Sequence, residues 1–569
     1  MGDNGRDDAA NVRGGWHPAL APTDAMRRRW RGVRRAAAAR IALPALLLAL
    51  LAALTAPPAA AARTLVFCSE GNPSGLQPAL QVDGTSFDAS SRTIYDRLLD
   101  FRPGSDELAP ALATAWQVSA DGLNYTLQLR RGVRFQRNFG FVPTREFDAD
   151  DVVFTFARMA DARHPYHAVS GGAYPYYAGM ELPRLLRAVR RVDAHTVRFE
   201  LSQPNAAFLA DLTMDFASIV SAEYAAQLLA EHRAQDFDLK PVGTGPFELV
   251  AWEPGAQLRY RAFAEHWRGR PAIDRLVFAI TPDASVRWAR LRAGECQLMA
   301  MPNPADLKSI EATPGIVAQR KPGMNIAYLA FNTEHGPLRD RRVRRALALA
   351  IDRDALVRAV YQGAGVVARG PLPPTLWAYD PTLQLPRFDP AAARRLLTEA
   401  GYPKGFSLTL WAFPNSRPYL PSARRAAEMI QADWERVGVH ASIRSYEWAE
   451  YLRRVGRGEH DAALYGWSGD NGDPDNFLGT LLNCGGVHTP QNIAEYCNRN
   501  YQELIDAALT RSDRATRRAL YAQAQRLFVD DLPWLPLAHA QIVVPMSNHV
   551  RGYTIPVVDV HEFGRVTLD

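Results

Sequence analysis

The chain has 569 residues, which exceeds the usual size of one hydrophobic core and predicts at least two lobes. Hydrophobic residues make up 47% of the sequence and charged residues 22%, a composition that excludes wholesale disorder. The net charge is +6, but residues 1–62 hold nine Arg and four Asp and account for +5 of it. The remaining charge, about +1, gives no cationic footprint for a polyanion, so no nucleic-acid partner is expected.

The N-terminus has the pattern of a removable export leader. A basic stretch runs from Met26 to Arg40, an apolar run of 14 residues follows from Ile41 to Leu54, and small residues lead to Ala62. We therefore assign residues 1–62 to a signal peptide and leader, expect cleavage near Ala62, and expect a periplasmic protein. A retained anchor is the alternative, although 14 residues are short for a bilayer span of about 20. Met1 and Met26 are both candidate start codons.

Beyond the leader, predicted strands and helices alternate without a repeat or a low-complexity segment. Alternating apolar residues predict strands over 125–129 and 196–201. The acidic run from Asp148 to Asp151 predicts the start of a helix. Residues 243–247, Gly-Thr-Gly-Pro-Phe, lack the third glycine of a nucleotide-binding loop and indicate a tight turn into a strand.

The C-terminal half has a clearer pattern. An apolar face predicts a helix from Arg341 to Tyr361, and Asp389, Pro390 and Gly401 mark the two ends of the next one. Strands are then expected over 406–412, 440–446 and 462–467, with helices over 422–437 and 447–457 between them. This β-α-β-α-β order is typical of a parallel sheet with right-handed crossovers, so the predicted fold class is α/β.

All four cysteines, Cys68, Cys296, Cys484 and Cys497, lie beyond the leader. An even number of cysteines in an exported chain predicts disulfides. Three pairings are possible, and proximity in the sequence favours Cys484–Cys497, which leaves Cys68–Cys296. A zinc site is the alternative, but neither a C-x-x-C spacing nor clustered histidines support it. No metal and no cofactor are therefore expected.

Two polar loops are expected where a ligand of an open α/β sheet binds, beyond the carboxyl ends of the strands. One loop, 412–419, contains Arg417, and the other, 468–475, contains Asp470. An arginine grips a carboxylate bidentately and an aspartate receives an ammonium, so this pair predicts a clamp for a zwitterion. The alternatives are a surface arginine beside a proline turn, and Asp470 or Asp473 as a turn cap or a calcium ligand. The loop does not have the spacing of an EF-hand.

Enzyme signatures are absent from the sequence: it contains no G-x-S-x-G, H-E-x-x-H or G-x-x-x-x-G-K-[ST] motif. No catalytic residue is assigned, and a secreted hydrolase stays a remote alternative. His164 and His167 are predicted to lie in a surface loop and not to bind a metal or haem. Trp411, Tyr419 and Trp467 flank the two polar loops, where they serve either the core or a closed ligand cleft.

Several segments carry a family resemblance, namely 64–71, 148–156, 169–172, 280–287, 429–434 and 466–477, the last reading Gly-Trp-Ser-Gly-Asp-Asn-Gly-Asp-Pro-Asp-Asn-Phe. Over residues 63–569 the chain resembles the extracellular solute-binding proteins of family 5, and among them the periplasmic dipeptide-binding proteins. The resemblance implies a two-lobed clamshell like that of type II periplasmic binding proteins, with mixed β-sheets flanked by helices. The implied parts are lobe I (63–95, 245–322 and 541–569), an extra subdomain packed on lobe I (96–244) and lobe II (323–540). Two crossing strands are expected to join the lobes.

In similar dipeptide binders, the residue matching Asp470 pairs with the α-ammonium of the ligand, and the residue matching Arg417 pairs with its α-carboxylate. The other matching positions of the pocket and the loop beside it are Trp467, Gly466, Tyr419 and Thr85. Val82 and Phe87 stand where relatives often carry a hydroxyl. The four cysteines match the disulfides Cys68–Cys296 and Cys484–Cys497.

The resemblance therefore implies a monomeric periplasmic protein that is not an enzyme. It is expected to capture a dipeptide and to deliver it to an inner-membrane ABC permease. Relatives also carry haem, glutathione or nickel chelates, so the fold by itself does not fix the ligand. A haem- or glutathione-binding transport protein of the same family is the alternative.

Overall fold

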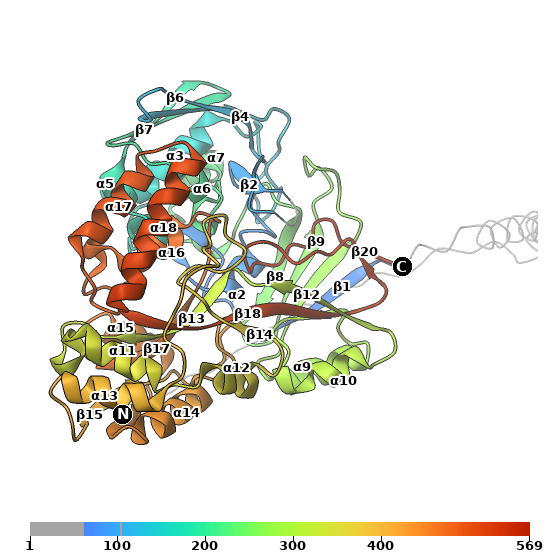
Figure 1. The fold of residues 1–569 in the computed structure, drawn as a ribbon. Helices are drawn as coiled ribbons and strands as arrows, with labels where there is room; N and C mark the ends of the chain where they lie inside the picture. Colours follow the sequence, from blue (N-terminus) through green and yellow to red (C-terminus); the bar gives the residue numbers. More distant parts are fainter. Residues whose placement is uncertain (1–61, 103–104) are drawn as a thin grey trace, which may run out of the picture. The chain divides into compact units, whose positions relative to one another are not determined.

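The computed structural model describes residues 62–102 and 105–569 (Figure 1). The predicted signal peptide and leader lie outside these residues, except for Ala62. None of the helices in the described part is both long and apolar enough to cross a membrane.

Within the described ranges, twelve strands form one mixed sheet. Ten of them follow one another across the sheet in the order β16 (Val439–Arg444), β15 (Phe406–Trp411), β17 (Ala462–Ser468), β13 (Asn325–Phe331), β18 (Trp534–Ser547), β11 (Leu298–Met299), β1 (Thr64–Ser69), β10 (Arg275–Ile280), β9 (Gln257–Ala262) and β8 (Phe247–Glu253). The other two, β12 (Ile316–Pro322) and β14 (Gly365–Val367), also pair with β18. The turn predicted over 243–247 leads into β8, as expected.

Two chain segments cross between the halves of this sheet. β18 is antiparallel to β13 over its first residues and to β12 from Gln541 to Ser547 (Figure 1). β12 and β13 follow each other directly in the sequence, so the same two segments connect both halves. One half packs around a core drawn from residues 324–540. The other half packs around a core drawn from residues 65–301 and 544–566, so the predicted two-lobed α/β fold is confirmed.

The β-α-β-α-β order predicted for the C-terminal half is present as β15, α14 (Ala423–Glu435), β16, α15 (Trp448–Val455) and β17. β15 lies between β16 and β17 and is parallel to both of them. Apolar side chains of α14, among them Ile430 and Trp434, are buried against this part of the sheet. The carboxyl ends of the three strands therefore lie at one edge.

The single helix predicted from Arg341 to Tyr361 is wrong, because the segment forms two helices, α11 (Arg341–Leu349) and α12 (Arg353–Tyr361). Asp352 separates them: its Oδ1 accepts the N–H of Ala355 at 2.8 Å and caps α12. The N–H of Asp352 in turn donates to Oδ2 of Asp433 on α14 at 3.1 Å. Both helices bury apolar residues in the same core, which is why one continuous helix was predicted.

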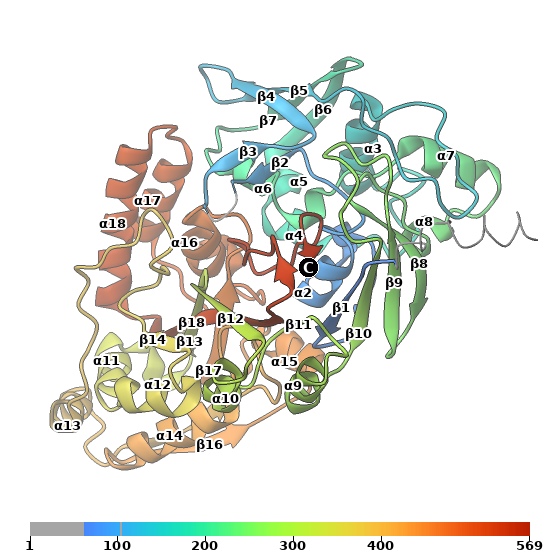
Figure 2. The same ribbon diagram turned by 90° about the vertical axis from the view of Figure 1, so that its right-hand side faces the viewer.

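A separate sheet of four strands has the order β4 (Ala113–Val118), β5 (Asn124–Leu129), β7 (Thr196–Leu201) and β6 (Leu186–Asp193) (Figure 2). α3 (Ala149–Ala160) packs against it, and its predicted start is confirmed by a capping box. In this box the N–H of Asp148 donates to Oδ2 of Asp151 at 3.1 Å. The strands predicted over 125–129 and 196–201 are likewise present as β5 and β7.

The remaining helices and strands are α2 (Gly84–Ala89), β2 (Leu99–Phe101), β3 (Leu108–Pro110), α4 (Pro175–Gly179), α5 (Leu182–Leu185), α6 (Phe208–Asp211), α7 (Ala222–Ala230), α8 (Asp236–Leu239), α9 (Ala284–Arg292), α10 (Leu307–Glu311), α13 (Pro390–Glu399), α16 (Asp475–Leu482), α17 (Arg499–Leu509), α18 (Arg514–Asp531), β19 (Val550–Arg551) and β20 (Thr567–Leu568). α13 has the predicted Asp389 cap, whose Oδ1 accepts the N–H of Ala392 at 2.8 Å. Gly401 beyond its end has a φ of +94°, which favours glycine.

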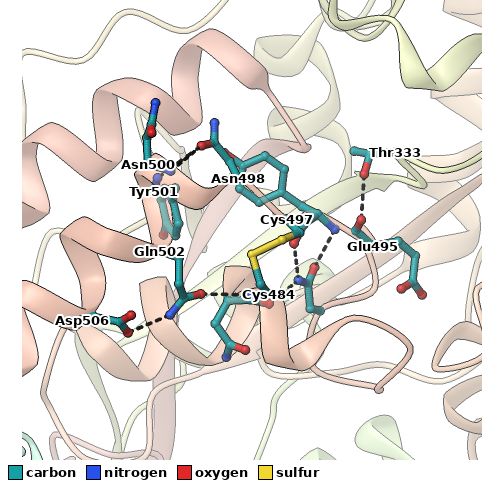
Figure 3. The surroundings of a disulfide bond; sticks show 12 residues. Thr333, Cys484, Glu495, Cys497, Asn498, Asn500, Tyr501, Gln502 and Asp506 are labelled. Atoms are coloured by element: carbon teal, nitrogen blue, oxygen red, sulfur yellow. Dashed lines mark hydrogen bonds between the residues drawn. A yellow bond between two sulfur atoms is a disulfide. The ribbon is translucent and has the colours of Figure 1, made fainter.

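Both predicted disulfides are present. Cys68 on β1 is bonded to Cys296, with Cα atoms 5.9 Å apart, and Cys484 is bonded to Cys497 across a Cα distance of 4.5 Å. Figure 3 shows the second bond between α16 and α17. Beside it, the N–H of Cys484 donates to Oε1 of Gln502 at 2.9 Å, which ties the loop to α17.

Replacing both Cys484 and Cys497 with serine is expected to lower the free energy of unfolding by about 3 kcal/mol, because the bond closes a loop of 13 residues. Urea unfolding of the oxidised proteins measures the difference. In excess reductant the variant and the parent protein should unfold at nearly the same urea concentration. Equal midpoints under oxidising conditions would contradict the expectation.

Candidate ligand-binding site

The structure places the two predicted polar loops at the same edge of the large sheet. Arg417 follows β15 and Asp470 follows β17, and these two strands are parallel neighbours. Both residues are half-buried, so neither is a fully exposed surface residue.

Asp470 lies in a recess where other side chains hold its carboxyl. The hydroxyl of Tyr176, on α4, donates to its Oδ1 at 3.1 Å, and Nδ2 of Asn476 lies 3.5 Å from its Oδ2. The N–H of Asp470 donates to Oδ1 of Asn476 at 3.0 Å, which fixes the turn. Burial, assisted by the nearby carboxylate of Asp215 and opposed by the Tyr176 hydrogen bond, raises the pKa of Asp470 to about 7. A cation beside this carboxyl would therefore be stabilised strongly.

The guanidinium of Arg417 stacks on an aromatic ring. Its Cζ lies 3.7 Å from the ring centroid of Trp448, the first residue of α15. Backbone hydrogen bonds of 3.1 and 3.0 Å join Arg417 to Leu420 and close the loop. Burial lowers the pKa of Arg417, although an arginine stays charged at neutral pH. Among the described residues its Nε is buried and has no hydrogen-bond partner, so the guanidinium has donor capacity left for an anion.

Tyr419 and Gly466 fit each other closely. The Tyr419 ring is buried, and the hydroxyl of Tyr361 donates to its backbone oxygen at 2.7 Å. A Cβ atom at position 466 would lie 2.2 Å from Cδ2 of Tyr419 and 2.5 Å from the backbone oxygen of Ile326. Any residue larger than glycine would therefore displace Tyr419 from the β17 strand beside the Arg417 loop.

The two other predicted positions lie at the borders of this region. The Nε1 of Trp467 donates to Oδ1 of Asn476 at 2.9 Å, the same oxygen that receives the Asp470 N–H. Thr85 lies on α2, half-buried, and its hydroxyl donates to Oε1 of Glu70 at 2.8 Å. Thr85 is thus engaged with Glu70, whereas Trp467 helps to fix the Asp470 turn.

Phe87, on α2, lies next to Tyr176, the residue whose hydroxyl donates to Asp470. Its ring centroid lies 6.0 Å from that of Tyr176, and the ring is buried with Val558 and Val560. Val82, in contrast, is 54% exposed. The apolar residue at position 87 therefore packs beside Tyr176, the hydroxyl donor to Asp470, while Val82 is exposed.

Three residues at the site are missing from the sequence-based prediction: Tyr176, Trp448 and Asn476. Trp448 follows β16, so the rule that located the other two loops at carboxyl strand ends would also have found it. Asn476 lies within the segment 466–477, which carried the family resemblance. Tyr176 is 294 residues from Asp470, and no local pattern connects the two.

The alternatives for the 470–475 turn concern Asp470 and Asp473, two of its three aspartates. Asp473 is buried and pairs with Arg517 at 2.7 and 2.8 Å, while its Oδ1 accepts the N–H of Asp475. Asp473 is therefore a structural residue of the turn. Within the described ranges no group of three His, Cys, Asp or Glu side chains is arranged to hold a metal ion. His164 and His167 lie in the loop between α3 and α4, as predicted, where both are half-buried and form hydrogen bonds with backbone groups.

A cavity of about 80 Å³ lies beside Arg417. Ser416 and Pro418 line it from the loop after β15, Ala540–Val544 line it from the crossing strand β18, and Asp559 and His561 complete it. Burial and the neighbouring Glu70 raise the pKa of Asp559 to about 6, and burial lowers that of His561 to about 4. Free space is therefore available next to the guanidinium, at the junction of both lobes.

Comparison with known proteins identifies the family of the chain. The family model of the bacterial extracellular solute-binding proteins, family 5 (middle), matches residues 107–489. The dipeptide-binding protein of Escherichia coli K12 is 48% identical over 519 residues, covering 91% of this chain and 97% of that protein. Heme-binding protein A of Haemophilus influenzae is 45% identical, covering 89% of this chain and 92% of that protein.

A solved structure gives the same result for the fold. The dipeptide-binding protein from Pseudoalteromonas sp. SM9913, in complex with Met-Leu, superposes with a TM-score of 0.83 at 39% identity. The match covers 89% of this chain and 100% of that chain. The sequence, the two-lobed fold and these relatives agree: this chain belongs to the bacterial extracellular solute-binding proteins of family 5.

Proposed function

We propose that this protein captures a dipeptide, or a similar short zwitterionic peptide, and delivers it to an ABC-type inner-membrane importer. Membership of a solute-binding family makes it a binding component of transport and not an enzyme. One observation carries the proposal. The guanidinium of Arg417, whose Nε has no hydrogen-bond partner among the described residues, and the carboxyl of Asp470 both lie at one edge of the sheet. The relatives named for dipeptide binding support the same ligand class.

In this proposal each charged residue holds one end of the peptide backbone. The carboxylate of Asp470 receives the α-ammonium, and the guanidinium of Arg417, oriented by Trp448, donates to the α-carboxylate. Tyr419, Gly466 and Trp467 shape the pocket between these ends, and Thr85 borders it. Asp470 and Arg417 bind only the two ends of the peptide backbone, so the distance between these ends is selected. The side chains of the ligand can therefore vary.

The proposed binding motion is a hinge closure of two lobes. We assign residues 63–95, 245–322 and 541–569 to lobe I, 96–244 to the extra subdomain and 323–540 to lobe II. The separate cores of the two halves and the crossing segments support this division. The hydrogen bond from Tyr176 to Asp470 joins the proposed subdomain to the proposed lobe II.

Ligands with blocked ends test the proposed function directly. Isothermal titration calorimetry with Ala-Ala should give one saturable site on the monomeric protein. N-acetyl-Ala-Ala lacks the ammonium and Ala-Ala-amide lacks the carboxylate, so each is expected to bind at least 30-fold more weakly, corresponding to about 2 kcal/mol. Equal affinity for all three ligands would refute the clamp. Native mass spectrometry of the purified protein would identify a peptide that co-purifies.

We also propose export to the periplasm with removal of the leader near Ala62. Arg63 supports this boundary, because its backbone N–H donates to Oδ2 of Asp274 at 2.9 Å and its backbone oxygen accepts from Asp274 and Arg275. The first residue after the predicted cut is thus held in the fold by backbone hydrogen bonds. Intact mass measurement of protein from the periplasmic fraction should give a chain that begins near Arg63. A periplasmic or membrane-bound chain that retains residues 41–54 would contradict the assignment.

Haem is the second candidate ligand, because a relative 45% identical to this chain is named heme-binding protein A. The buried His561 beside Arg417 is neutral at physiological pH, but its Nδ1 already lies at hydrogen-bond distance from the Tyr553 hydroxyl. An absorbance titration with haemin distinguishes the candidates. A saturable Soret shift that Ala-Ala reverses would place haem in the same site. Titration with glutathione in the calorimeter tests the remaining alternative.

A further inference from the structure

A second cavity, of about 440 Å³, is lined mainly by residues 92–102, 266–269 and 552–565. Neither Arg417 nor Asp470 lines it, nor does any of the other proposed peptide contacts. Its volume lies in the range of sites that hold small molecules. This cavity has no role in the proposed capture of a dipeptide.

Arginine dominates the charged lining of this cavity. Among the described residues that line it, five are arginines and three are Asp or Glu. One of the three acids, Asp96, is already engaged, since its Oδ2 accepts from the Thr244 hydroxyl and from Nε1 of Trp267, both at 2.9 Å. This oxygen is thus satisfied by donors of the protein, and arginines outnumber carboxylates in the lining.

Arg92 is the best compensated of these arginines. It is 5% exposed, and its guanidinium lies 3.1 Å from Asp100, 3.2 Å from Asp215 and 3.2 Å from Glu562. These carboxylates fix it in place, and together they keep the pKa of Arg92 above its usual value despite burial. Arg92 is thus a structural member of the cavity wall.

Three guanidinium groups lie within 4 Å of the carboxylate of Asp100. Besides Arg92, it lies 3.4 Å from Nη2 of Arg268 and 3.8 Å from Nη2 of Arg97. Burial opposes its ionisation, but Arg97, Arg92 and Arg268 together hold the pKa of Asp100 below its usual value. Arg92 also has Asp215 and Glu562, so Asp100 is left as the one carboxylate within 4 Å of Arg97 and Arg268 among the ion pairs of the described residues, apart from weaker neighbours.

Arg97 has the least satisfied guanidinium of the interior. It is 4% exposed, its Nη1 donates to the backbone oxygen of Ser91 at 2.8 Å, and its Nε is buried without a partner among the described residues. Burial, reinforced by the neighbouring charge of Arg92, lowers the pKa of Arg97. Arg565 lies exposed at the same cavity and has no ion pair within the described ranges. An anion in the cavity would supply an acceptor for the guanidinium of Arg97 and a counter-charge for Arg565.

The remaining lining includes apolar side chains, those of Phe101, Pro556, Val557 and Val558. A bare inorganic anion would leave this surface without contacts. We propose that the cavity is a second binding site, separate from the peptide site, for a small organic oxyanion that joins a phosphate or carboxylate group to an apolar part. The oxyanion group would bind Arg97, Arg268 and Arg565, and the apolar part would contact the Phe101 side.

Calorimetric titration with phenyl phosphate, inorganic phosphate and benzoate tests this site. Phenyl phosphate is expected to bind with one-to-one stoichiometry and at least tenfold more tightly than inorganic phosphate, because it also uses the apolar wall. Comparison of phenyl phosphate with benzoate shows whether phosphate or carboxylate is the preferred group. Saturating Ala-Ala should leave the affinity for phenyl phosphate unchanged, which separates this site from the peptide site whether or not Ala-Ala binds.

Variants at the cavity rim show where the probe binds. The double variant Arg268→Gln/Arg565→Gln alters two side chains that are partly or fully exposed, so it should fold, and it is expected to weaken phenyl phosphate binding at least tenfold. Arg190→Gln is the matched control, because Arg190 pairs with Glu200 on the four-stranded sheet, outside the cavity lining. Absence of saturable binding for all three probes overturns the proposal, and so does equal weakening by the control.

Discussion

Replacing Asp470 with Ala is expected to weaken Ala-Ala binding by about 2–5 kcal/mol, or roughly 30- to 5,000-fold. Without this carboxylate the ligand ammonium is buried with no anionic partner, and Tyr176 and Asn476 offer only neutral groups. Isothermal titration calorimetry measures the loss. An affinity within threefold of the parent protein would remove Asp470 from the site.

Arg417→Ala is expected to weaken binding of the same ligand by a similar factor, because the peptide carboxylate then loses its bidentate partner. The variant also leaves Trp448 without its stacked guanidinium. Trp448→Leu therefore provides a second measurement, with a smaller expected loss, since Arg417 keeps its charge but loses its orientation. Arg424→Ala is the matched control, because Arg424 is exposed on α14 and pairs only with Glu428. It should bind Ala-Ala as the parent protein does.

Ala-Ala affinity is expected to fall as the pH is lowered below 7. Asp470 receives the ammonium only when it is ionised, and its pKa in the ligand-free protein is raised to about 7. Binding at lower pH must therefore release a proton, and the affinity should decrease by up to about tenfold per pH unit. Above pH 8 the peptide amine itself loses its proton, so the affinity should be highest near pH 7–8. Calorimetry at pH 5.5, 6.5, 7.5 and 8.5 measures this profile.

Asp470→Asn serves as the control for the pH profile, because an amide cannot titrate. The variant should bind weakly at every pH, without the decrease on the acid side. The free energy of unfolding provides a second check, because the contribution of Asp470 to it is expected to fall as the pH rises, whereas the affinity for Ala-Ala is expected to rise. A carboxyl whose pKa is raised by folding contributes stability below its unfolded pKa near 3.8, and this contribution is lost as the pH rises through 7. The ligand-free protein should therefore lose stability relative to Asp470→Asn between pH 5 and 8, and a constant difference would contradict the raised pKa.

Much of lobe II could be predicted from local patterns. The strands β15, β16 and β17 and the helices between them lie within a few residues of the predicted ranges, because alternation, capping residues and terminal glycines are properties of adjacent residues. The parallel arrangement then follows from the order of the elements, and it places the Arg417 and Asp470 loops at one edge. The one misassigned segment, 341–361, keeps its apolar face across the break, so periodicity does not reveal the cap at Asp352.

Contacts between distant segments could not be predicted in this way. Tyr176 reaches Asp470 from another part of the chain, and Arg268 reaches Asp100 across 168 residues of sequence. The same holds for the close fit of Tyr419 on Gly466, which depends on how the loop after β15 folds back. Such contacts set the pKa of Asp470 and the charge of the second cavity.

The sequence by itself determined three features: the residue types of the clamp, the cysteines available for disulfides, and the β-α-β-α-β order of the segment that carries the site. These features depend on neighbours along the chain. Only the tertiary structure decided that Tyr176 donates to Asp470, that Trp448 stacks on Arg417 and that several arginines line a separate cavity. The physical reason is that burial and charge pairing depend on every group within a few ångströms, and most of those groups come from distant parts of the sequence.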